Sequence, residues 1–103
     1  MDSAEAIRFV TLHFLETYKS TLDEDNYESA KTLIEATPKD KVVSRISRFL
    51  RPFAEQSEKG TLSKKKLIAD GWIRKDCQIS SKDIKEMGRQ ASLAHSLCSS
   101  ISD

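Results

Sequence analysis

Residues 37 to 54 carry an apolar stripe that constrains the fold class more than any other stretch of the chain. Large apolar side chains recur there at steps of three and four residues, on one side of an α-helix: Val42, Ile46, Phe49, Leu50 and Phe53. Thr37 is suited to cap this helix, and Pro38 to occupy its first position. Such a stripe has to be buried against another element, so the sequence predicts a packed helical protein.

The same stretch has a second, cationic side. Lys41, Arg45 and Arg48 recur at the helical period, and Arg51 continues that side. Further bases flank the only tryptophan, Trp72, and they are Lys64, Lys65, Lys66, Arg74 and Lys75. We interpret this basic surface as a solvated face or as a binding surface for an acidic protein or a nucleic acid, in which case binding weakens with salt.

The net charge of +1 conceals a strong segregation of charge along the chain. Residues 1–38 carry 8 acidic and 3 basic side chains, whereas residues 39–75 carry 4 acidic and 11 basic ones. A basic segment of this kind fits either an acidic partner or an internal match to the acidic first third. The sequence leaves both alternatives open.

We predict an all-α fold, a single domain over residues 1–103 that forms a bundle of four to five helices. The presence of only 3 Gly and 2 Pro argues against a turn-rich all-β fold. The expected helices span residues 3–22, 26–36, 38–54, 63–69 and 81–100. A polar loop is expected over residues 55–62. The last helix has an inner stripe of mostly small side chains, namely Ile84, Met87, Ala91, Ala94, Cys98 and Ile101, joined by Gly88 and His95.

Residues 63–76 allow two structures. One is a short helix ended by Gly71 in the left-handed conformation, followed by an extended piece through Trp72 and Ile73. The other is a β-hairpin near residues 67–75 that turns at Asp70–Gly71 and pairs Ile68 with Ile73. We prefer the helix.

The first expected helix is apolar on two sides. Its main stripe is Ile7, Val10, Phe14, Leu15, Tyr18 and Leu22. Phe9 and Leu12 fall on nearly the opposite side, which indicates either a central helix or a contact with another protein. We therefore assign Phe9 and Leu12 as candidate partner-binding residues. In the second helix we expect buried positions at Tyr27, Ala30, Leu33 and Ile34.

Two short segments resemble known families. The segment KKLIADGWIRKD, residues 65–76, resembles the end of the recognition helix and the start of the wing in winged-helix proteins, which implies nucleic-acid binding. Residues 12–36, which include FLETYKSTLDEDNYESAKTLIEA, resemble the two-helix dimerisation hairpin called LisH. Tyr27 and Ala30 stand at the matching places of that hairpin, and the resemblance implies self-association.

No catalytic or cofactor motif is present. The chain has no Gly-rich phosphate loop, no HExxH and no GxSxG, so we predict no enzyme activity and no cofactor. A zinc site from Cys77, His95 and Cys98 with His13 lacks the close paired-ligand spacing of known sites, and we read the cysteines as free thiols. No apolar run reaches the roughly 20 residues of a membrane span, and no signal peptide follows Met1.

These observations favour a non-catalytic protein-interaction or adaptor module, intracellular in the cytoplasm or nucleus, that binds another protein and also itself. The alternative is a helical, winged-helix-like domain that binds nucleic acid through the basic surface. Salt separates them, because phosphate contacts weaken steeply with salt and an apolar interface does not.

Overall fold

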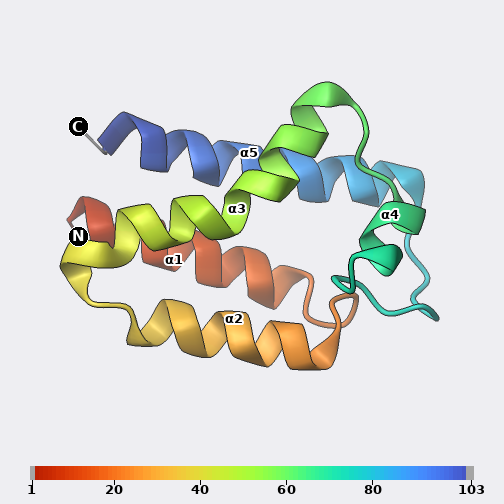
Figure 1. The fold of residues 1–103 in the computed structure, drawn as a ribbon, viewed down its shortest axis with the longest axis horizontal. Coiled ribbons are helices and arrows are strands. Elements are labelled where there is room, and N and C mark those ends of the chain that lie inside the picture. The colour runs from red at the N-terminus through yellow and green to blue at the C-terminus, as the bar shows by residue number, and fades with distance from the viewer. Residues whose placement is uncertain (1, 102–103) are drawn as a thin grey trace.

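The computed structural model describes residues 2–101, which form an all-α fold (Figure 1). The predicted fold class is confirmed, and these residues contain no β-strand. In chain order the elements are α1 (Ser3–Thr17), α2 (Glu24–Ala36), the 3-10 turn η1 (Lys39–Lys41), α3 (Val42–Lys59), α4 (Lys64–Ala69) and α5 (Ser81–Ile101). The side chain of Ile101, expected on the inner stripe of α5, lies outside the described residues.

The core lies where α3 packs along α5, with α1 against both helices and α2 against α1 (Figure 1). On α3, the apolar stripe predicted from the sequence is buried at Val42, Ile46, Leu50 and Phe53. On α5 the buried side chains are Ile84, Met87, Ala91, Ala94 and Cys98. Several of these are small, and α5 approaches α3 so closely at Gly88 that a Cβ there would clash with Ser57.

Short polar side chains cap most of the helices. Asp2 accepts a hydrogen bond from the Glu5 amide at 2.9 Å, and Asp23 accepts one from the Asn26 amide at 3.0 Å. At the other end of α2, the guanidinium of Arg8 donates to the carbonyls of Ile34 at 2.7 Å and Thr37 at 2.9 Å. These contacts satisfy backbone groups that a helix end leaves without partners.

The expected end of the first helix at residue 22 is wrong. Helix α1 ends at Thr17, and Leu22 forms an isolated antiparallel bridge with Ile73. The Asp23 amide donates to the Trp72 carbonyl at 2.9 Å, and the Arg74 amide donates to the Thr21 carbonyl at 3.0 Å. Leu22 and Ile73 are both buried. The α1–α2 turn is therefore held by the segment after α4.

That bridge also decides between the two structures considered for residues 63–76. Residues 64–69 form helix α4, and Gly71 has a φ of 80°. The alternative β-hairpin does not form in the described chain, because Ile73 pairs with Leu22 and not with Ile68. Ile73 therefore pairs with Leu22, which is distant in the sequence, instead of with the nearby Ile68.

The predicted cap at Thr37 and first helical position at Pro38 are wrong, because Thr37 is the C-cap of α2 and its hydroxyl donates to the Leu33 carbonyl. Helix α3 begins at Val42, after η1, and not at the expected residue 38.

Helix α3 also ends later than expected. It continues through Pro52 to Lys59 and ends at Gly60, which has a φ of 71°. The loop expected over residues 55–62 is therefore wrong for its first half. Pro52 is exposed, whereas Leu50 before it and Phe53 and Ala54 after it are buried, so packing on both sides of the missing amide keeps the helix continuous.

Helix α2 corrects two further expectations. It begins at Glu24, earlier than the expected residue 26. Leu33, expected to be buried, is 47% exposed, while Tyr27, Ala30 and Ile34 face the core. Leu33 lies about 100° around the helix from Ile34, which moves it to the edge of the buried side.

Candidate interaction surfaces

Three large apolar side chains are exposed on α1 and α5: Phe9 at 62%, Leu93 at 51% and Leu97 at 42%. Figure 1 shows these two helices running in opposite directions. His13 of α1 and Gln90 of α5 line one hollow between them. Phe9 lies one turn before His13, and Leu93 and Leu97 lie one and two turns after Gln90. Because the two helices are antiparallel, Phe9 of α1 and the leucines of α5 lie at a similar height along the shared helix axis.

A second hollow, of about 270 Å³, joins Phe9 to α2. Its lining includes Tyr27 and the half-buried Leu12, which lies three residues after Phe9 on α1. The structure thus brings the two predicted partner-binding residues together. We call Phe9, Leu12, Leu93 and Leu97 the apolar face.

Tyr27 and Glu16 form a polar contact in this hollow. The Tyr27 hydroxyl donates a hydrogen bond to Glu16 Oε2 at 2.6 Å. This bond to a carboxylate, together with burial, raises the pKa of Tyr27 to about 12, and the same bond lowers the pKa of Glu16. The contact links α1 to α2 next to the apolar face.

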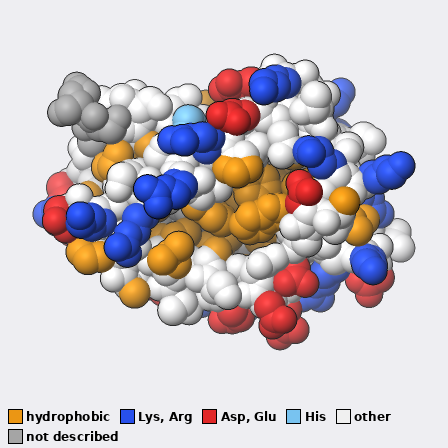
Figure 2. All heavy atoms as spheres, viewed as in Figure 1, with side chains coloured by type: hydrophobic (Ala, Val, Ile, Leu, Met, Phe, Trp, Pro, Cys, Tyr) orange, Lys and Arg blue, Asp and Glu red, His pale blue; other side chains and the backbone are white. Residues whose placement is uncertain are grey.

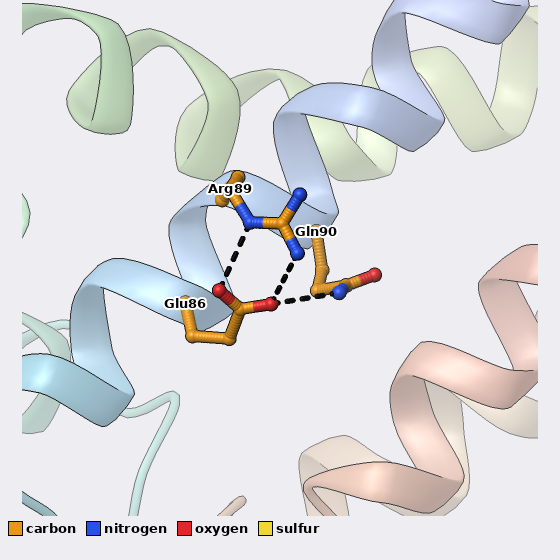
Figure 3. Close-up of polar contacts among 3 residues, drawn as sticks. All are labelled: Glu86, Arg89 and Gln90. Atoms are coloured by element: carbon orange, nitrogen blue, oxygen red, sulfur yellow. Dashed lines mark hydrogen bonds and ion pairs between the residues drawn. The ribbon is translucent and has the colours of Figure 1, made fainter.

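A compact polar cluster of Glu86, Arg89 and Gln90 lies on α5 about one turn before Leu93 (Figure 3). Arg89 Nε donates to Glu86 Oε2 at 2.9 Å, and Gln90 Nε2 donates to Glu86 Oε1 at 2.9 Å. The hydrogen bonds from Arg89 and then Gln90 hold the pKa of Glu86 at about 2. Glu86 and Arg89 therefore neutralise each other next to the apolar face.

A different hollow, of about 310 Å³, lies between α2 and α3. We call it the basic hollow, and it is lined by Leu33, Arg45, Arg48 and Phe49. Figure 2 shows hydrophobic side chains gathered near the centre of this side of the molecule, with Lys and Arg along the first half of α3. The Phe49 ring meets Trp72 edge-on, with centroids 5.7 Å apart.

The cations that the sequence assigned to α3 are exposed. Lys41, Arg45, Arg48 and Arg51 have no ion-pair partner among residues 2–101. A further cation, Lys39, lies next to them and forms an ion pair with Asp2. The α3 cations are therefore available to a ligand.

The bases around Trp72 divide into two groups. Lys64 Nζ donates to the Cys77 carbonyl at 2.9 Å, and Arg74 Nε donates to the Leu22 carbonyl at 3.0 Å. These two side chains hold the connecting segments in place. The remaining three, Lys65, Lys66 and Lys75, are exposed.

Leu33 is the surface residue that sequence reasoning missed. The sequence predicts a core position for it because it is a leucine on an amphipathic helix. Its angular position, off the Tyr27–Ala30–Ile34 stripe, was the signal that could have identified it.

The candidate zinc ligands do not converge. Within residues 2–101, no three His, Cys, Asp or Glu side chains form a group that could hold a metal ion. Cys77 and Cys98 are free thiols, and burial raises the pKa of Cys98.

None of the helices in the described part of the chain is long and apolar enough to cross a membrane. Comparison with known proteins finds no family model, no curated protein and no solved structure that matches this chain. The functional interpretation therefore depends on the apolar face and the basic hollow.

Proposed function

We propose that this chain is a non-catalytic protein-interaction module that binds its partner through the apolar face. The observation that carries the proposal is Phe9, which is 62% exposed on a helix whose other side is already buried. Leu12 lies next to Phe9 in the hollow against α2, and the exposed Leu93 and Leu97 lie on the neighbouring helix α5. Large exposed apolar groups on adjacent elements mark interaction sites in proteins. The two free thiols support an intracellular location.

The partner we propose for this face is a second copy of the chain. A two-fold axis would place the apolar face against its own copy, which supplies a matching apolar surface. Glu86 and Arg89 neutralise each other within one chain, so two copies can meet there without like-charge repulsion. The resemblance of residues 12–36 to a dimerisation hairpin supports the same partner.

Sedimentation velocity over a wide concentration range tests this proposal. Wild type should shift from monomer to dimer as concentration rises, and the shift should persist in high salt because the interface is apolar. The double variant Phe9→Ser/Leu97→Ser should remain a monomer with unchanged helical content by circular dichroism. As a matched control, Leu33→Ser alters an exposed leucine outside the face and should dimerise like wild type. A wild-type chain that stays monomeric throughout would refute self-association.

A second candidate function is nucleic-acid binding by the basic surface. Arg45, Arg48 and Arg51, which have no ion-pair partner in the part of the chain described, support it. Binding of labelled single- and double-stranded oligonucleotides should fall steeply with salt and weaken further in Arg45→Ala/Arg48→Ala. No binding at low salt would exclude this function.

A further inference from the structure

We propose that the basic hollow is a second docking site, which binds a short acidic segment of a partner protein through one leucine or aromatic side chain. This site is separate from the apolar face and goes beyond the proposed self-association. It combines an apolar recess with unpaired cations, and both features restrict the chemistry of the ligand.

The apolar part of the site is Leu33 and Phe49. Leu33 is 47% exposed on α2 and Phe49 is half-buried on α3. The hollow of about 310 Å³ is at the lower end of the range for ligand pockets, so it suits one large side chain rather than an extended surface. Phe49 is held by ring contacts to Trp72 at 5.7 Å and to Phe53 at 6.2 Å. The wall is therefore rigid before a ligand arrives.

The charged part of the site is Arg45 and Arg48. Both line the hollow, and no acidic side chain lines it with them. Arg48 also lines the neighbouring hollow on α3 together with Arg51 and a single acid, Asp40, so the charge past the recess stays net positive. Guanidinium groups bind carboxylates with two parallel hydrogen bonds. Carboxylates next to the inserted apolar side chain would therefore meet both arginines.

The surroundings favour an acidic peptide over a nucleic acid. Asp and Glu side chains follow the lower edge of the same view, where α2 runs (Figure 2). The exposed acids of α2 include Glu24, Asp25 and Glu28, which would repel a long polyanion that tracks across this side. A short peptide avoids them and still uses the apolar recess, for which a phosphate backbone has no matching group.

The experiment is a selection from a random peptide library on the wild-type chain, with the selected peptides then titrated against Trp72 fluorescence. Trp72 is the only tryptophan and contacts Phe49, so its emission reports on the hollow. Selected peptides should combine Asp or Glu with a leucine or aromatic residue. Affinity should fall about tenfold or more in Arg45→Glu/Arg48→Glu, and should also fall in Leu33→Ser and at high salt.

Two control variants make the test specific. Lys65→Glu/Lys75→Glu introduces the same change of net charge away from the hollow and should bind the peptide like wild type. Phe9→Ser/Leu97→Ser should also bind it normally, which separates this site from the apolar face. Selection of peptides without acids, or no selection at all, would overturn the proposal. So would oligonucleotides that alter Trp72 emission and compete with the peptide for Arg45 and Arg48, because they would assign the site to nucleic acid.

Discussion

The close packing of α5 against the end of α3 should make Gly88 intolerant of any side chain. A Cβ at this position would lie 2.7 Å from Ser57 Oγ, 2.8 Å from Leu62 Cδ2 and 2.9 Å from Ser57 Cβ. The hydroxyl of Ser57 can rotate, and the methyl of Leu62 lies at the end of a flexible side chain. Ser57 Cβ is attached directly to the α3 backbone and cannot move alone. Gly88→Ala therefore has to separate the two helices that form the centre of the core.

Two opposing effects set the magnitude. Alanine favours the helix over glycine by about 1 kcal/mol. Overpacking a well-packed core costs about 1–3 kcal/mol, and the contact with Ser57 Cβ places Gly88 at the upper end of that range. We expect Gly88→Ala to lower the free energy of unfolding by about 1–2 kcal/mol, which corresponds to a fall in Tm of roughly 5–15 °C for a domain of this size. Gly88→Val should cost more.

Urea and thermal unfolding followed by circular dichroism provide the measurement. Gly60 is the control, because it has a φ of 71° and no atom lies within 4 Å of the position of its Cβ. Gly60→Ala should cost about 1 kcal/mol through backbone strain alone, and Gly60→Asn should recover part of that loss. At Gly88 asparagine should be worse than alanine, since volume is the cause. A Gly88→Ala variant that gains about 1 kcal/mol from helix propensity would refute the close-packing argument.

Three further predictions concern single contacts. The pKa of Glu16 is lower in the folded chain than in the unfolded chain, so its ionised carboxylate stabilises the fold above pH 4.5. This contribution should be lost as pH falls through the pKa of Glu16 in the folded chain. The raised pKa of Tyr27 stabilises the fold below pH 10.0, and this contribution should be lost as pH rises to about 12. In urea unfolding measured across pH, Tyr27→Phe should therefore reduce the change in the free energy of unfolding at both the acidic and the basic end. Pro52→Ala should stabilise the chain by about 1–3 kcal/mol by thermal unfolding, and no gain would mean that α3 already compensates for the missing amide. Leu22→Ala should cost about 2–5 kcal/mol in urea unfolding, and a loss well below 1 kcal/mol would show that the bridge to Ile73 contributes little.

The parts of the fold that the sequence predicts are those set by local spacing. The stripe of α3 and the inner stripe of α5 both depend on residues within a few turns of one another. Phe9 was identified as exposed for the same reason, because its angular position on α1 is opposite Ile7 and Phe14. Each of these inferences uses only the period of one helix.

The errors share a different cause, which is packing between distant segments. Leu22 is not part of α1, because it forms a buried antiparallel bridge with Ile73, which is distant in the sequence. Helix α3 passes Pro52 because α5 covers the residues that follow, although proline normally ends a helix. The juxtaposition of Leu33 with Phe49 and two arginines likewise depends on how α2 lies against α3, which no single-helix pattern contains.

The segregation of charge along the chain shows how the fold leaves the basic hollow unneutralised. Helices α2 and α3 run in opposite directions (Figure 1), so the second half of α2 lies next to the first half of α3. Three of the four acids of α2 lie in its first half (Glu24, Asp25 and Glu28), whereas Arg45 and Arg48 lie in the first half of α3. The fourth acid, Glu35, lines the hollow next to Phe9 and not the basic hollow. The opposite charges are thus separated, and no ion pair joins α2 to α3 within residues 2–101. At physiological salt, charges more than about 8 Å apart are largely screened in water, so the arginines keep their affinity for an external carboxylate.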